Sequence, residues 1–131
     1  MKPIKNNVIV NGRFTTQRLT GVQRYAFEIT RRLPFSAIRV VSPQPVAAEY
    51  KFLENVTVVD QFGKFAHKSG LGHLWEQIAL PRWVSKEDLL WSPCGSGPLA
   101  IKNQVVTIHD IANLEHLEWF NHCFYSLLLL L

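Results

Sequence analysis

Short runs of β-branched residues alternate with segments of helical periodicity along this sequence. Residues 7–12, Asn-Val-Ile-Val-Asn-Gly, predict a buried first strand. Apolar residues then recur at helical spacing from Val22 to Leu33, which predicts a helix with Thr20 at its N-cap and Pro34 as its stop. Further strand-like runs lie at residues 38–42, 56–60, 89–92 and 104–108. Because parallel neighbours need a crossover that is usually helical, this alternation predicts an α/β fold with a Rossmann-like parallel sheet and helices on both faces.

The segments between and after these strands carry weaker signals. Residues 61–72 mix Gly, Lys, Ser and His without periodicity, which predicts an exposed loop. Residues 71–80 predict a second helix that ends at Pro81. Residues 117–131 are compatible with a helix, and the last five are all leucine, far fewer than the roughly twenty apolar residues that span a bilayer. We therefore interpret residues 1–131 as one domain that is truncated in its last helix.

The composition is that of a single globular domain. The chain has 131 residues, of which 47% are hydrophobic and 18% charged. Its formal charge of +4 comes from scattered Lys and Arg, not from a dense basic stripe, so we expect no nucleic-acid partner. Cys94 and Cys123 have no metal-ligand spacing, and residues 1–7 lack the apolar stretch of a secretory signal. These features favour a reduced, cytoplasmic setting without a metal site, and the positive charge suggests peripheral contact with the inner face of the cell membrane.

The start of the first helix is a candidate anion site. The segment opens at Thr20-Gly21-Val22-Gln23-Arg24, where free backbone N–H groups carry partial positive charge and Gly21 lets a ligand approach closely. Arg13 and Arg24 would add charge-assisted hydrogen bonds. The alternative is that Thr20 only caps the helix and the arginines face water. Neither G-x-G-x-x-G nor G-x-x-x-x-G-K-[ST] occurs here, which disfavours nicotinamide and ATP enzymes.

A second candidate is His109-Asp110, directly after a strand that we predict to be buried. A neutral imidazole exchanges hydrogen bonds with sugar hydroxyls, and a neighbouring carboxylate can fix its tautomer. A structural histidine is an equally good interpretation of the pair alone. No further His or Asp with ligand spacing accompanies it, so a metal phosphohydrolase is not favoured.

Other polar and aromatic residues are interpreted as surface or packing positions. This group includes Glu76, Gln77, Glu115, Glu118 and the loop at Ser96, which lacks the G-x-S-x-G elbow of hydrolases. The four tryptophans are interpreted as core residues.

Several motifs, in order and spacing, resemble bacterial glycosyltransferase family 4. They are Gly12-Arg13-Phe14, the segment from Thr20 to Ala26, Trp91-Ser92-Pro93, Gly97-Pro98-Leu99, and Val106-Thr107-Ile108-His109-Asp110. The stretch from Trp91 to Glu118-Trp119-Phe120 is similar to mannosyl- and rhamnosyltransferase-like members of polysaccharide and lipopolysaccharide pathways. The resemblance covers essentially the whole chain.

This resemblance implies the N-terminal, acceptor-side half of a GT-B enzyme, in which two Rossmann-like domains face each other across a cleft. Such enzymes retain the anomeric configuration and need no metal or other cofactor. The implied partners are a nucleotide-sugar donor and a lipid-linked or polysaccharide acceptor. By resemblance, Thr20, Gly21 and Gln23 lie beside the donor's phosphates and sugar, while His109 contacts the sugar and Asp110 supports it.

The sequence also departs from the family pattern. Leu117 stands where relatives usually carry Pro, and Gly95 stands where Asn is expected. The second domain, with its basic residues and its E-x7-E glutamates, is missing, so we expect this chain to be inactive alone unless a separate C-terminal domain completes it. The alternative function is a truncated, non-catalytic binding or interaction module. The transferase hypothesis requires the Gly21 and His109 loops to meet at one crevice.

Overall fold

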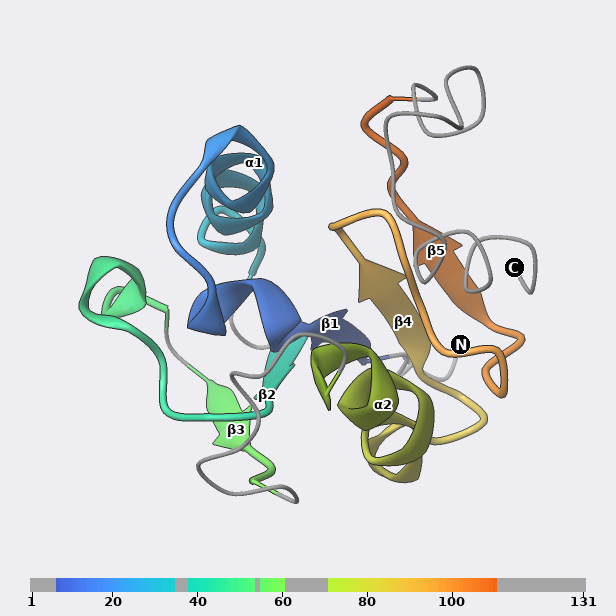
Figure 1. The fold of residues 1–131 in the computed structure, drawn as a ribbon. Helices are drawn as coiled ribbons and strands as arrows, with labels where there is room; N and C mark the ends of the chain where they lie inside the picture. Colours follow the sequence, from blue (N-terminus) through green and yellow to red (C-terminus); the bar gives the residue numbers. More distant parts are fainter. Residues whose placement is uncertain (1–6, 35–37, 54, 61–70, 111–131) are drawn as a thin grey trace, which may run out of the picture.

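The described part of the chain forms one parallel sheet in a computed structural model, which covers residues 7–34, 38–53, 55–60 and 71–110. Five strands lie in the order β3-β2-β1-β4-β5, all parallel (Figure 1). The strands are β1 (Val8–Asn11), β2 (Ile38–Ser42), β3 (Val56–Val58), β4 (Leu89–Ser92) and β5 (Gln104–Val106). The α-helices are α1 (Gly21–Thr30) and α2 (Leu71–Ile78), and the 3₁₀ helices are η1 (Gly12–Thr16), η2 (Ala48–Tyr50) and η4 (Leu80–Trp83).

Helices cover both faces of the sheet, as the sequence predicts. Successive side chains of a strand point to opposite faces, and Ile9 and Val10 of β1 accordingly belong to different core clusters. Ile9 packs with Trp75 of α2, and Val10 packs with Ala26 of α1. Figure 1 shows α1 and α2 on opposite sides of the sheet. The α/β prediction of a Rossmann-like parallel sheet is confirmed.

The two predicted helices are present in the structure, but each ends earlier than predicted. The first helix ends at Thr30, before Pro34, and the second ends at Ile78, with Pro81 inside η4. The loop predicted at residues 61–72 is described only at its last two residues, which begin α2, and the helix predicted at 117–131 lies outside the described residues.

The strand predicted at residues 104–108 was expected to be buried, and this expectation is wrong. β5 stops at Val106, and Val105 is 50% exposed. It is the last strand of the described sheet, so only one of its sides pairs with a neighbour. A run of β-branched residues indicates a tendency to form a strand, whereas the burial of its side chains depends on what packs beside the strand.

The strand order places a topological switch point between β1 and β4. The chain runs from β1 to β2 and β3 on one side, then returns to β4 and β5 on the other. In open parallel sheets, ligands bind beyond the carboxyl ends of the strands at such a point. All five strands are parallel, so the segments that follow them leave from the same edge of the sheet.

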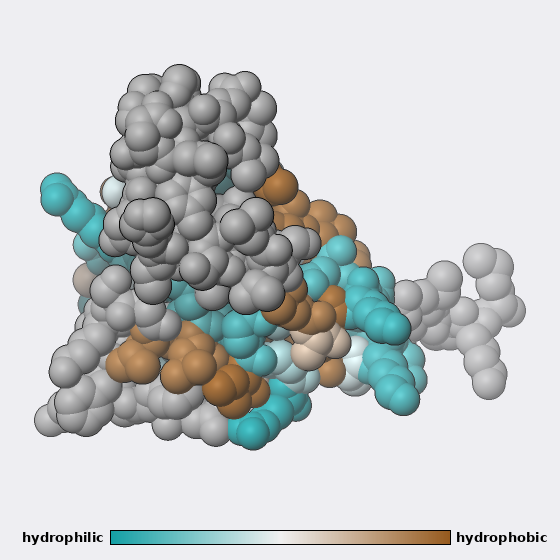
Figure 2. Space-filling model, turned by 45° about the vertical axis from the view of Figure 1, so that its right-hand side comes forward, coloured by the Kyte–Doolittle hydropathy of each residue, from teal (hydrophilic) through white to brown (hydrophobic). Residues whose placement is uncertain are grey.

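The exposed surface is mixed in character. On the face shown in Figure 2, hydrophobic patches are separated by hydrophilic ones. Among the described residues, no helix combines the length and apolar character needed to cross a membrane.

Candidate functional site at the switch point

A buried carboxylate, Glu76 of α2, lies at the switch point. Asn11 at the end of β1 donates from Nδ2 to Glu76 Oε2 at 2.7 Å, and Ser96 donates from Oγ to Glu76 Oε1 at 2.9 Å. Asn11 Nδ2 also lies 3.2 Å from Ser92 Oγ at the end of β4. The side chain of Glu76 is 1% exposed. The carboxylate therefore joins α2 to the end of β1 and to the loop after β4, and Asn11 extends the cluster to the end of β4.

Glu76 and Ser96 were interpreted as surface or packing positions; their burial agrees with packing, but their place in a polar cluster was not predicted. Both are buried, and each completes a hydrogen bond that the other needs. No sequence signal marked Glu76 as buried, because a glutamate in a helix is usually solvated and the partners of this one lie in other elements. A buried carboxylate needs such hydrogen-bond partners.

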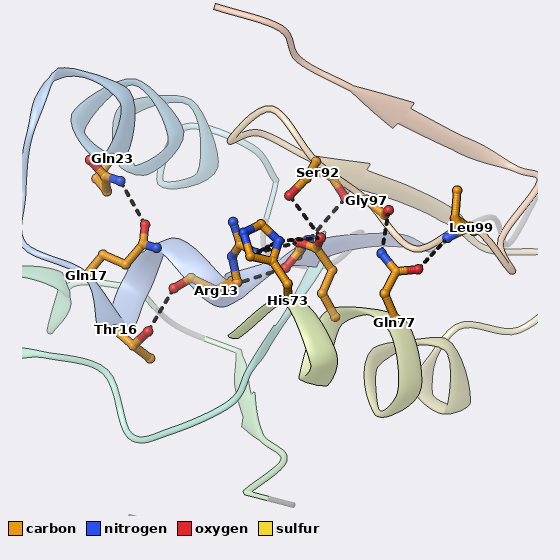
Figure 3. Close-up of polar contacts among 12 residues, drawn as sticks. Arg13, Thr16, Gln17, Gln23, His73, Gln77, Ser92, Gly97 and Leu99 are labelled. Carbon is orange, nitrogen blue, oxygen red and sulfur yellow. Dashed lines mark hydrogen bonds and ion pairs between the residues drawn. The ribbon is translucent and has the colours of Figure 1, made fainter. Parts of the chain in front are cut away.

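Arg13 extends the cluster toward solvent. Its Nη1 atom lies 2.6 Å from Nδ1 of His73 and 3.7 Å from Oε2 of Glu76, and its side chain is 12% exposed. Figure 3 shows Arg13 and His73 side by side. Arg13 was expected to assist an anion at the start of α1, but its guanidinium is instead engaged by α2.

The contact with Arg13 determines the tautomer of His73. A guanidinium only donates, so Nδ1 of His73 accepts, and the neutral ring carries its hydrogen on Nε2. Burial lowers the pKa of His73, the positive charge of Arg13 lowers it further, and the carboxylate of Glu76 opposes the shift. These effects favour the neutral ring that accepts from Arg13.

The residues predicted at the start of α1 form a local hydrogen-bonded group. Thr20 occupies the N-cap position with an extended backbone, but its hydroxyl does not bond to a helix N–H. It donates to Oε1 of Gln23, whose Nε2 donates to Oε1 of Gln17 at 2.8 Å. Gly21 is exposed, and a Cβ added there would meet nothing within 4 Å. The side-chain cap expected of Thr20 is therefore not formed, and the Gly21 backbone stays accessible.

Of the other predicted site residues, Arg24 and Asp110 are exposed. Arg24 donates its backbone N–H to the Thr20 carbonyl at 2.8 Å, the first hydrogen bond of α1. Asp110 lies next to His109 in sequence, at the end of the described part of the chain.

His109 lies between the loop after β4 and α1. Its Nε2 donates to the carbonyl of Pro93 at 2.7 Å, because a carbonyl can only accept. Its ring packs edge-on against Tyr25 of α1, with centroids 4.9 Å apart. Tyr25 follows Gly21 by about one helical turn. The structure thus brings His109 to the helix that Gly21 begins.

A short extension of β5 supports this placement. Thr107 donates its N–H to the Ser92 carbonyl at 2.9 Å, and its carbonyl accepts from Gly95 at 3.0 Å. The Thr107 hydroxyl also accepts from Trp91 Nε1 at 3.0 Å. These bonds hold the segment before His109 along the end of β4.

The segments at the start of α1 and around His109 leave the same edge of the sheet as the Glu76 cluster. A separate hollow of about 330 Å³, lined by Val84, Lys86, Ile101 and their neighbours, lies before β4 and β5 and so at the opposite edge. In the described part of the chain, no three His, Cys, Asp or Glu side chains gather where they could hold a metal ion. Comparison with protein-family models, curated proteins and solved structures gives no match to this chain.

Proposed function

We propose that this chain is the acceptor-side domain of a retaining GT-B glycosyltransferase, which transfers a sugar from a nucleotide-diphosphate donor to a lipid-linked or polysaccharide acceptor. The observation that carries the proposal is the contact between His109 and Tyr25. It brings two segments that are far apart in the sequence to one edge of a parallel sheet, where such folds bind ligands.

The proposed roles follow from the available hydrogen-bonding groups. The open backbone at Gly21 and the positive end of α1 suit a phosphate oxygen of the donor. Since Nε2 of His109 donates to Pro93, its Nδ1 is free in the neutral ring to accept from a sugar hydroxyl. Oriented groups of this kind stabilise the charges that develop as the sugar leaves the diphosphate. A second Rossmann-like domain would supply most of the donor contacts.

The proposal is tested by titrating the ¹⁵N-labelled chain with nucleotide-diphosphate sugars and following the amides of Gly21 and His109 by NMR. We expect both amides to shift together and to saturate with the same dissociation constant. Gly21→Ala should weaken binding, because a methyl group there blocks close approach of a phosphate to the backbone. A donor panel that shifts neither amide would contradict the proposal.

His109→Phe provides the matched test of the imidazole. Phenylalanine keeps a ring that can pack against Tyr25 but has no nitrogen to accept from a hydroxyl. We expect the variant to keep its melting temperature within a few degrees and to lose the preference for nucleotide sugars over the free nucleotide. Unchanged preference in a folded His109→Phe variant would remove His109 from the proposed site.

A further inference from the structure

We propose that Arg13 and His73 form a second binding site, for an anionic oxygen of a phosphate or carboxylate, at the switch point between β1 and β4. This site is separate from the one proposed at Gly21 and does not depend on sugar transfer. It is built from η1 and α2, and its chemistry follows from three features of the pair.

The first feature is that the pair offers only donors to a ligand. His73 uses Nδ1 to accept from Arg13, so the neutral ring presents Nε2–H. A guanidinium has five N–H donors in a planar fork and no acceptor. The partner for such a face is an oxygen that accepts several hydrogen bonds, which a phosphate or carboxylate provides and a single hydroxyl does not.

The second feature is that Glu76 orients Arg13 without using up its donors. The oxygens of Glu76 are taken by Asn11 and Ser96, and the closest approach to Arg13 Nη1 is 3.7 Å, beyond direct hydrogen-bond length. The carboxylate therefore holds the guanidinium electrostatically. The Glu76 carboxylate also offsets part of the positive charge of Arg13. Binding of an anion should therefore depend on the hydrogen bonds that the guanidinium donates and not on its charge alone.

The third feature is that the pair is held in place but remains reachable. The side chains of Arg13 and His73 are 12% and 28% exposed. The Arg13 stem passes close to Gly72, where an added Cβ would lie 3.3 Å from Arg13 Cδ. His73 lies in the first turn of α2, whose positive end adds to the attraction for an anion. A ligand here would meet donors whose positions are already fixed.

The test is an NMR titration of the intact chain with inorganic phosphate, uridine diphosphate, glucuronate and, as a neutral control, methyl mannoside. We expect the three anions to shift the His73 imidazole resonances saturably and the neutral glycoside to leave them unchanged. Tightest binding by uridine diphosphate would assign the site to a nucleotide, by glucuronate to an acidic glycan, and by phosphate to a simple phosphate group. No saturable shift with any anion, or an equal shift with the glycoside, would overturn the inference.

Variants distinguish the contribution of the Arg13 guanidinium hydrogen bonds from the contribution of its positive charge. Arg13→Gln should weaken anion binding by about tenfold or more, whereas Arg82→Gln removes the same charge from an exposed position of η4 and should leave binding unchanged. Arg13→Lys keeps the charge and serves if Arg13→Gln does not fold, and it should still bind more weakly than the unmodified chain. Equal binding by folded Arg13→Lys and the unmodified chain would overturn the role of the fork. If the sugar donor does not bind at Gly21 but anions still bind at His73, the proposed function is contradicted and the anion site is not.

Discussion

Asn11 and Glu76 are 65 positions apart in sequence, and the Nδ2 of Asn11 donates to the Oε2 of Glu76 at 2.7 Å. This hydrogen bond joins the last residue of β1 to the middle of α2, inside a cluster that also contains Ser92 and Ser96. Because the group is buried, each partner depends on the others to replace its lost hydrogen bonds to water. The switch point is therefore fixed in shape by side chains as well as by the sheet.

Removing the carboxylate should destabilise the fold strongly. Glu76→Ala leaves the donors of Asn11 and Ser96 buried without their acceptor, and we expect the free energy of unfolding to fall by about 3 kcal/mol. Urea denaturation followed by circular dichroism measures the change. Glu87→Ala removes an exposed carboxylate and should alter stability by less than about 0.5 kcal/mol. Similar losses for the two variants would mean that the cluster does not stabilise the fold.

Two glycines offer a matched test of packing. A Cβ at Gly12 would lie 2.6 Å from the carbonyl oxygen of Val41 and 2.8 Å from a methyl of Val40, while a Cβ at Gly21 would meet nothing within 4 Å. We expect Gly12→Ala to cost about 2 kcal/mol or more, because β2 and η1 must separate. Gly21→Ala should be neutral or stabilise the chain by up to about 1 kcal/mol, because Ala is favoured over Gly in a helix.

Thermal melting of the two variants beside the unmodified chain measures the difference. If Gly21→Ala is destabilised, weaker donor binding by this variant could result from partial unfolding, and the binding test at Gly21 would no longer isolate the contact with the phosphate. Equal melting temperatures for Gly12→Ala and Gly21→Ala would contradict the close packing of η1 against β2.

Acid should destabilise the chain through His73. Its pKa is lowered in the folded state, by burial first and then by Arg13. As the pH falls below the ordinary value of 6.5, the unfolded chain takes up a proton at this position while the folded chain does not. The free energy of unfolding therefore decreases as the pH falls from about 6.5 toward the lower folded pKa, and this contribution is fully present only above that window.

Urea denaturation between pH 7.5 and pH 5 measures this dependence. His73→Gln removes the titrating group but keeps an oxygen that can accept from Arg13, so its stability should change less over the same range. Parallel curves for the two proteins would show that His73 does not titrate differently on folding. The other histidines and the carboxylates are common to both proteins and cancel in the comparison.

Much of the fold could be predicted because its signals are local. The β-branched runs that predict β1 and β2 match the observed strands closely, and helical spacing located α1. The exposure of β5 was missed, since it depends on which strands lie beside it. The contact of His109 with Tyr25 is also long-range and was not predicted; the hypothesis that the Gly21 and His109 loops share one crevice stays a prediction.

The Glu76 cluster could not be derived from the sequence for a different reason. A glutamate in a helix is usually solvated, and only its partners show that this one is buried. Those partners come from the end of β1 and from the segment after β4, so the cluster exists only once the strand order is known. Arg13 was singled out, but its partner His73 was not, because their contact requires α2 to pack beside η1.

Gly95 provides a test of a departure from the resemblance, since Asn was expected at this position. Its φ is +84°, a left-handed conformation that glycine adopts freely and that Asn tolerates better than other residues with a side chain. A Cβ there would meet nothing within 4 Å, so only the backbone limits substitution. We expect Gly95→Ala to cost about 1 kcal/mol and Gly95→Asn to cost less. Thermal melting compares the two, and an Asn variant less stable than the Ala variant would show that backbone conformation does not explain the choice of residue.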